Sequence, residues 1–400
     1  MRNNNESLLS VIISELNRDY YEQHRARLLF YPLRVPQAYL FGFNTVYYYV
    51  LKAVETVITL VVLYYSAREL NLSYFSSAMF SLLSFCGEQS CVWWKLGTPQ
   101  LQATCFFSIG FYFMIRYLKY NKKSSAVISI LFYIFMANFH ESYLVLIPFI
   151  VLFVIYYGFI ENGDSEKITL SGIWSMAKKR LGFELALVLI FASLMIYILF
   201  FLGAEEYGIV EAGYPLSMGI KNWMDSMRGG LKYYWSFGIL LTIIIATFFE
   251  KTKKMWMEVI LFVSIAAPQF LLYEKEGFYE RYMLPLTVGW GLFFIVAMYG
   301  RNVLTGVRKY IYSFLLVAMV MLQIRTIVVE ADYYRFRGES TTTMLNELLE
   351  VSSEGFTVAS GLGVCNPEAD MTVEGWMFAH KMKNAYYWND GLKALKEDRP

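Results

Sequence analysis

About ten apolar segments dominate this sequence, and each is close to the roughly 20 residues that a helix needs to cross a bilayer. Backbone polar groups in lipid must hydrogen-bond within their own segment, so such segments are helical. We expect spans at 46–67, 72–87, 101–119, 126–139, 142–160, 183–203, 234–250, 255–273, 282–300 and 310–329. The sequence therefore predicts an all-α, polytopic membrane protein, a bundle of about ten transmembrane helices.

The composition supports this class over a soluble enzyme. Hydrophobic residues make up 57% of the chain and charged residues 17%, whereas a soluble domain carries about 25% charged residues. Tyr and Phe number 32 each, and aromatic rings suit the two interfaces of a bilayer. A net charge of +2 gives no basic footprint for a nucleic acid. We expect membrane lipids as neighbours and no nucleic-acid partner.

The basic residues predict the orientation of the spans. If the spans alternate, four Lys/Arg clusters fall on one side of the membrane, which the positive-inside rule makes cytoplasmic. These clusters lie at 116–123, 178–180, 251–254 and 301–309. The opposite side holds longer loops that are rich in carboxylates. We therefore expect a multi-pass protein of a bacterial plasma membrane whose functional side is extracytoplasmic.

The chain divides by character into three parts. Residues 1–45 form an extracytoplasmic interfacial segment, 46–329 the transmembrane domain, and 330–400 a small extracytoplasmic segment. Leu8 to Leu16 reads as a short interfacial helix. In the tail, Thr341 to Val351 predicts a short amphipathic helix with Ser/Thr cap candidates before it, and Phe356 to Ala359 is typical of a strand.

The first outer segment, residues 1–45, has the densest group of ionisable side chains that could take part in catalysis or binding. Asp19, Glu22, Arg25 and Arg27 lie together in a stretch that is too polar to cross lipid. A carboxylate there can act as a general base on a hydroxyl or hold a divalent cation, and arginines suit a phosphate through paired hydrogen bonds. The alternative is an interfacial helix whose arginines extend their charged ends toward water.

The second outer segment combines a carboxylate with paired indoles. Glu88 lies at the end of the second expected span, and Trp93 and Trp94 follow in the loop. Indole rings offer stacking surfaces for sugar rings, although a pair of tryptophans at a span end is also typical of an aromatic belt. Glu88 is the best second carboxylate on this side.

Two further motifs lie on the same side. His140-Glu141 forms the tight turn between the fourth and fifth spans, and Arg281 opens the ninth. Ionisable groups at membrane depth are functional by default, whereas a hydrogen-bonded turn and an interfacial arginine are the plainer alternatives. His140 and Glu141 do not have metal-ligand spacing, so we expect no metal centre there. No cofactor is required by the sequence, except for a possible divalent cation at the carboxylates.

In their order along the chain, these segments resemble those of the GT-C glycosyltransferases, which include the protein O-mannosyltransferases and the aminoarabinose transferase of lipid A. The similar stretches are Asp19 to Pro36 with Leu40-Phe41-Gly42-Phe43-Asn44, Trp94 to Gln100, His140 to Pro148, and Arg281-Tyr282-Met283-Leu284-Pro285. The resemblance covers most of 15–330. The family has a span before its catalytic carboxylate, so we expect an initial helix to be missing or diverged here.

The resemblance implies transfer of a sugar from a polyprenyl-phosphate donor to an extracytoplasmic glycan, lipid or protein acceptor. By position, Asp19 matches the family's catalytic carboxylate, Glu22 comes second, and Glu88 matches a second acidic residue of some members. Arg281 would contact the donor phosphate. Arg25 and Arg27 would assist it, and the sugar or acceptor would meet Trp93, Trp94, His140 and Glu141.

Two other functions remain open on the sequence. A polymerase of the O-antigen or exopolysaccharide type shares the topology and the lipid-linked substrates, and a large arginine-rich loop between late spans would favour it. The loop at 205–233 contains Arg228, Lys221 and Lys232 as its only cations. A transporter or flippase of lipid-linked sugars would show matched halves with broken helices, and apart from Pro148 and Pro268 inside spans, no such match is visible.

Overall fold

A computed structural model describes part of the chain, and almost all of that part is helical. The chain divides into two compact units, Met1–Ile327 and Val328–Pro400. The described residues are 7–21, 25, 27–42, 44–87, 99–161, 178, 181–201, 221, 257, 260–261, 263–265, 284–297, 299, 306–353, 358–359 and 385–386. The expected all-α fold is confirmed for these residues.

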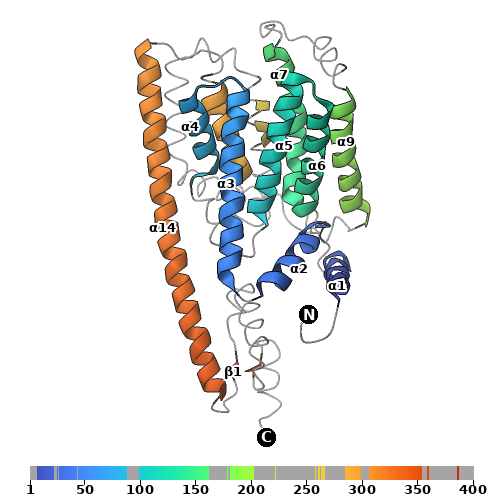
Figure 1. Cartoon of the computed structure of the whole chain (residues 1–400), viewed down its shortest axis with the longest axis vertical. Coiled ribbons are helices and arrows are strands. Elements are labelled where there is room, and N and C mark those ends of the chain that lie inside the picture. Colours follow the sequence, from blue (N-terminus) through green and yellow to red (C-terminus); the bar gives the residue numbers. More distant parts are fainter. Residues whose placement is uncertain are drawn as a thin grey trace. The chain divides into compact units, whose positions relative to one another are not determined.

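The helices follow the expected apolar segments closely (Figure 1). Before the first span come α1 (Leu8–Tyr21) and α2 (Phe30–Phe41). The bundle helices are α3 (Thr45–Glu69), α4 (Tyr74–Phe85), α5 (Gln100–Tyr120), α6 (Lys123–Phe139), α7 (Ile147–Glu161), α9 (Leu181–Ile196), α12 (Leu284–Gly291) and α14 (Gly306–Ser353). A 3-10 helix, η2 (Glu141–Leu146), precedes α7, and π-helical turns η3 (Tyr197–Phe201) and η5 (Leu292–Ala297) continue α9 and α12. The expected span at 234–250 and most of the one at 255–273 lie outside the described residues.

Within the described residues, two helices are both long and apolar enough to cross a membrane. They are Thr45–Glu69 and the Gly306–Glu347 part of α14. Several other apolar helices are shorter, among them Tyr74–Phe85, Lys123–Phe139 and Gly182–Ile196. Two long helices weakly suggest that the protein associates with a membrane, whereas the ten-span arrangement remains a prediction.

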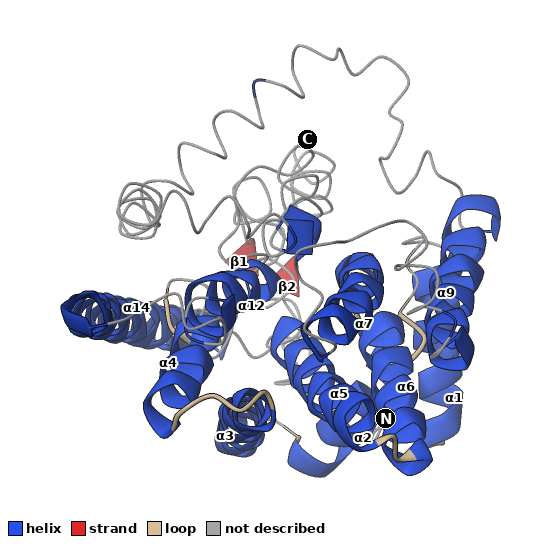
Figure 2. Ribbon diagram, turned by 90° about the horizontal axis from the view of Figure 1, so that it is seen from above, coloured by secondary structure: helices blue, strands red, loops and turns tan. Residues whose placement is uncertain are grey.

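Helix α5 lies at the centre of this bundle and packs against α3, α6, α7 and α12 (Figures 1 and 2). Its contact with α6 leaves no room for a side chain at Gly110, where an added Cβ would lie 2.7 Å from Cε1 of the fully buried Tyr133. Ser129 on α6 also donates a hydrogen bond of 2.8 Å to the Gly110 carbonyl. Small residues at helix interfaces allow such close backbone contact in membrane bundles, and Gly110 therefore fixes the α5–α6 distance.

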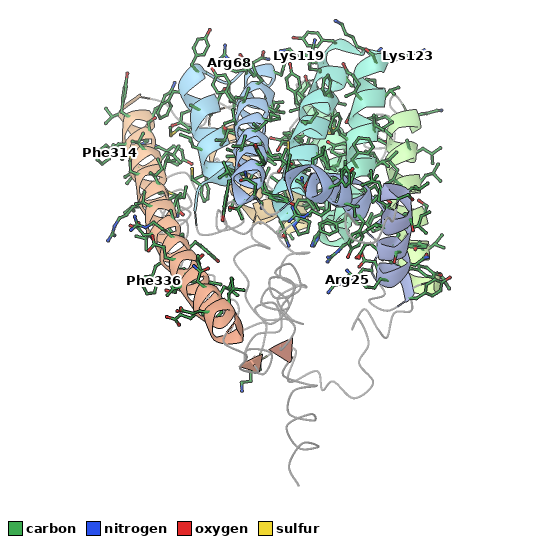
Figure 3. The ribbon with its side chains drawn as sticks, turned by 60° about the horizontal axis from the view of Figure 1, so that its bottom comes forward. Arg25, Arg68, Lys119, Lys123, Phe314 and Phe336 are labelled. Atoms are coloured by element: carbon green, nitrogen blue, oxygen red, sulfur yellow. The ribbon has the colours of Figure 1, made fainter. Side chains whose placement is uncertain are left out.

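Charged residues mark the two ends of the bundle. At one end, Lys119 on α5 donates to the Glu69 carboxylate of α3 at 3.2 Å. Figure 3 shows Arg68, Lys119 and Lys123 at this end and Arg25 at the opposite one. The first residues of α3 and α5 and the last residues of α6 therefore share the end where Arg25 lies.

Two expectations about element boundaries are wrong. The first helix extends beyond Leu16 to Tyr21, so Asp19 lies in its last turn and not in a loop. The expected short helix at 341–351 is instead the end of α14, which continues without a break from Gly306 to Ser353. This helix contains no proline, and its one interior glycine, Gly338, costs only about 1 kcal/mol.

In the second unit, the strand expected at 356–359 is found where residues are described. Val358–Ala359 (β1) pairs in parallel with Ala385–Tyr386 (β2). The strands are two residues each, so the described chain remains helical in character.

Candidate functional site

Among the described carboxylates of the first outer segment, Asp19 is the most deeply buried, with 2% of its surface exposed. The Tyr31 hydroxyl, on the following helix α2, donates to Asp19 Oδ1 at 3.1 Å. The chain also folds back after α1, because the Arg25 backbone N–H donates to the Asp19 carbonyl at 2.9 Å. These contacts hold the carboxylate between α1 and α2.

The surroundings of Tyr31 keep its hydroxyl protonated, so that it can donate a hydrogen bond. Burial raises the pKa of its hydroxyl, and this effect outweighs the hydrogen bond from Arg18, which lowers the same pKa. Tyr31 is therefore protonated at neutral pH. Arg18 Nη2 donates to the Tyr31 oxygen at 3.4 Å, and Arg18 also pairs with Glu15 on the same face of α1. A line of polar groups thus leads from Glu15 through Arg18 and Tyr31 to Asp19.

His140 belongs to a second polar group, which lies at the first turn of α5. Its side chain is 4% exposed, and its Nε2 lies 3.3 Å from Nε2 of the buried Gln100. Tyr143 donates to the Gln100 carbonyl at 3.0 Å, and its hydroxyl lies 2.6 Å from Thr104 Oγ1. His140 is thus a satisfied, buried histidine in a hydrogen-bonded network, at the end of α6.

The two groups are connected through neighbouring residues. The Leu29 backbone N–H donates to the Asn138 carbonyl at 3.0 Å, and the rings of Phe30 and Phe139 lie 5.6 Å apart, edge to face. Since Tyr31 follows Phe30 and His140 follows Phe139, these contacts bring the first outer segment against the α6–η2 turn. Figure 1 shows α2 beside this end of the bundle.

Of the other predicted site residues, the structure describes Arg25, which is exposed, and Arg27, which is half-buried. The side chains of the remaining ones are not described: Glu22, Glu88, Trp93, Trp94, Glu141 and Arg281. Their predicted roles therefore stay predictions.

One hydrogen bond joins the segments next to Glu88 and Arg281. Thr287 on α12 donates to the Ser84 carbonyl on α4 at 2.6 Å. Ser84 precedes Glu88 by four residues, and Thr287 follows Arg281 by six. The segment that leads into the second outer loop therefore lies beside the segment that follows the Arg281 motif.

Sequence reasoning missed Tyr31, Gln100, Thr104 and Tyr143. A signal for part of this network exists on α5, where Gln100, Thr104 and Ser108 recur every four residues and so share one helix face. All three are buried, and a polar stripe on an apolar helix indicates a face turned toward the protein interior. Tyr31 gives no such signal, because tyrosine is frequent throughout the sequence.

In the part of the chain that the structure describes, no group of three or more His, Cys, Asp or Glu side chains is arranged to hold a metal ion. What the described site offers chemically is a carboxylate held by a tyrosine, with amide, hydroxyl and imidazole groups nearby in the fold. Such groups suit hydrogen bonding to a hydroxylated ligand.

No protein-family model matches the chain, and neither a curated protein nor a solved structure matches it significantly. The resemblance to the GT-C glycosyltransferases thus rests on the sequence motifs alone.

Proposed function

We propose that this chain is a multi-pass protein of about ten spans that transfers a sugar from a polyprenyl-phosphate donor to an extracytoplasmic acceptor. The observation that carries the proposal is Asp19, a buried carboxylate oriented by Tyr31, at the end of the bundle opposite Lys119. The sequence predicts that this end faces away from the cytoplasm. Contacts between the first outer segment and the α6–η2 turn further support a shared site.

The proposed reaction is one direct displacement. Asp19 accepts the proton of the acceptor hydroxyl while that oxygen forms a bond to the anomeric carbon. The bond between this carbon and the phosphate oxygen breaks, and its electron pair leaves with the prenyl phosphate. Arg281, with Arg25 or Arg27, balances the charge on the departing phosphate, as positioned cations do in many active sites. Glu22 and Glu88 are the further acidic residues of this site.

A transfer assay tests this function directly. Purified protein in liposomes is given a radiolabelled polyprenyl-phosphate hexose and a cell-envelope extract as the source of acceptor. We expect label to move from the prenyl lipid to the envelope fraction in proportion to the amount of protein. A ladder of lengthening products would indicate a polymerase instead. Label that crosses the bilayer while still attached to the prenyl lipid would indicate a flippase, and either result would contradict the proposal.

Thiol labelling tests the topology that the proposal needs. In a chain whose four native cysteines are replaced by alanine, we expect a membrane-impermeant maleimide to label a Tyr21→Cys variant from outside intact spheroplasts. A Lys122→Cys variant should react after the membrane is permeabilised and not before. Both positions are exposed, so the matched pair differs only in the side of the membrane. Equal labelling of the two variants from outside would exclude the alternating topology.

A further inference from the structure

A hydrogen-bonded cluster joins α3 to α5 at the end of the bundle opposite Asp19. Glu69 is the one carboxylate among the described residues from 66 to 123. Lys119 Nζ donates to the Glu69 carbonyl at 2.8 Å, to Glu69 Oε2 at 3.2 Å and to Asn71 Oδ1 at 3.2 Å. The Tyr120 hydroxyl donates to the same Oε2 at 2.9 Å. Lys119 thus uses all three of its N–H groups, and its charge balances that of Glu69.

Arg116 is a second cation beside the same carboxylate. Its Nε lies 4.0 Å from Glu69 Oε1, which is too far for a hydrogen bond. Within the described part of the chain, this Nε is buried and has no hydrogen-bond partner, although buried polar groups nearly always have one. The guanidinium lies 5.7 Å from the centroid of the Tyr112 ring and 6.0 Å from that of Tyr120, and 32% of the side chain is exposed. Arg116 is therefore a surplus positive charge that can be reached from the surface.

The position and shape of this charge suit a phosphate group. A guanidinium can donate two parallel hydrogen bonds to a phosphate, and Arg116 lies one turn before the end of α5, where a membrane helix meets the head groups. The sequence predicts that this end faces the cytoplasm, where anionic lipids attract basic residues. Lys122 and Lys123, in the turn after α5, are exposed, and Figure 3 shows Lys123 at the same end as Lys119. These charges favour an anionic phospholipid.

Apolar side chains on α3 lie directly beside the cluster. Tyr65 and Ile58 precede Glu69 by about one and three turns and so share its helix face. Both side chains are exposed. Leu63, on the opposite side of the helix, is fully buried, so the face that carries Tyr65 and Ile58 is the outer one. This face leads from Glu69 toward the middle of the helix.

The neighbouring helix α5 presents a similar strip. Phe113 and Ile109 precede Arg116 by about one and two turns and share its helix face. Both are partly exposed, whereas Phe111, on the opposite side of the helix, is fully buried. Since α3 and α5 pack against each other, their two outer strips border one another. An acyl chain that runs parallel to the helices would contact both strips while its phosphate reaches Arg116.

We propose that this end of α3 and α5 binds an anionic phospholipid of the phosphatidylglycerol type. The Arg116 guanidinium donates to the phosphate, Lys122 and Lys123 attract its charge, and an acyl chain lies along Tyr65 and Phe113. The site goes beyond the proposed function, because it lies at the opposite end of the bundle from Asp19. It requires that α3 and α5 lie in a bilayer and not that a sugar is transferred.

Lipid binding to the full-length protein tests the site, with native mass spectrometry in detergent as the measurement. The probes are phosphatidylglycerol, which is anionic, phosphatidylcholine, which has the phosphate but no net charge, and a polyprenyl-phosphate hexose. We expect phosphatidylglycerol to bind more tightly than phosphatidylcholine. Arg116→Gln should weaken its binding about tenfold, through loss of charge-assisted hydrogen bonds. Arg116→Lys keeps the charge and loses the paired geometry, so it should weaken binding only about threefold.

Arg337→Gln on α14 is the matched control. The Arg337 guanidinium also lies over two tyrosine rings, 5.6 Å from the centroid of Tyr333 and 5.9 Å from that of Tyr334. The same chemical change there should leave the affinity for phosphatidylglycerol unchanged. A double variant, Lys122→Gln with Lys123→Gln, changes exposed side chains and spares the contacts of Glu69. It should lower the affinity for phosphatidylglycerol about fivefold and that for phosphatidylcholine little.

Thermal unfolding of each variant separates loss of the lipid from loss of the fold. If Arg116→Gln unfolds below wild type, the double lysine variant decides the result. Equal affinity for phosphatidylglycerol and phosphatidylcholine, wild-type binding by Arg116→Gln, or an equal loss in Arg337→Gln would overturn the proposal. So would a prenyl lipid that binds more tightly than phosphatidylglycerol and is lost in Arg116→Gln, because the site would then hold the donor. A failed transfer assay would leave these affinities unchanged, so the two proposals fail separately.

Discussion

Replacing Asp19 by asparagine is expected to slow sugar transfer at least about a hundredfold, because a general base contributes 10²- to 10⁴-fold to a reaction rate. Asparagine has nearly the same shape, and its carbonyl oxygen can still accept from the Tyr31 hydroxyl, which lies 3.1 Å from Asp19 Oδ1. The fold should therefore survive while the proton acceptor is lost. The measurement is the initial rate of label transfer at saturating donor.

Asp332→Asn is the matched control for this variant. Asp332 lies on α14 and pairs with Arg335 at 3.3 Å, and both side chains are exposed. The same chemical change there should leave the rate within about twofold of wild type, since exposed ion pairs contribute little. A normal rate in Asp19→Asn would remove Asp19 as the base, and Glu22 would then be the next carboxylate to test.

The helices of this protein could be predicted well from the sequence, for a physical reason. An apolar run bounded by polar residues specifies a helix whatever its partners are, so the span expected at 101–119 is found as α5, Gln100–Tyr120. Helix ends are less well specified. α1 continues through polar residues to Tyr21, and α14 continues through Gly338, because neither point carries a proline to stop the helix.

The partners of the site residues could not be predicted, because they depend on how each helix is rotated about its own axis. Lys52 and Glu55 are spaced to share a face of α3, and the sequence indicates a pair within that helix. In the structure, Glu55 accepts a hydrogen bond from Gln102 on α5, a partner that no spacing within α3 indicates. Tyr31 likewise meets Asp19 only because α1 and α2 fold back on each other. Sequence reasoning found the carboxylates and missed what orients them.

The packing of α5 leads to the second large effect that we expect. Phe111→Ala should lower the free energy of unfolding by about 3–5 kcal/mol, as large-to-small core substitutions do. Phe111 is fully buried. Its ring lies 4.9 Å from that of Phe153 and 5.8 Å from that of Phe107. Helices in a bilayer associate through such packing rather than through hydrophobic transfer, so an unfilled cavity removes much of what holds α5 to α7. Thermal unfolding in detergent measures the loss.

Phe314→Ala on α14 is the control, because it removes the same ring from an exposed position. Phe314 is 72% exposed and is drawn on the outer side of its helix in Figure 3. Detergent or lipid chains would fill the space that its ring leaves, so no cavity forms and the midpoint of unfolding should stay near that of wild type. Equal losses in the two variants would mean that Phe314 is also packed against protein. No loss in Phe111→Ala would mean that the aromatic centre of the bundle does not hold α5 in place.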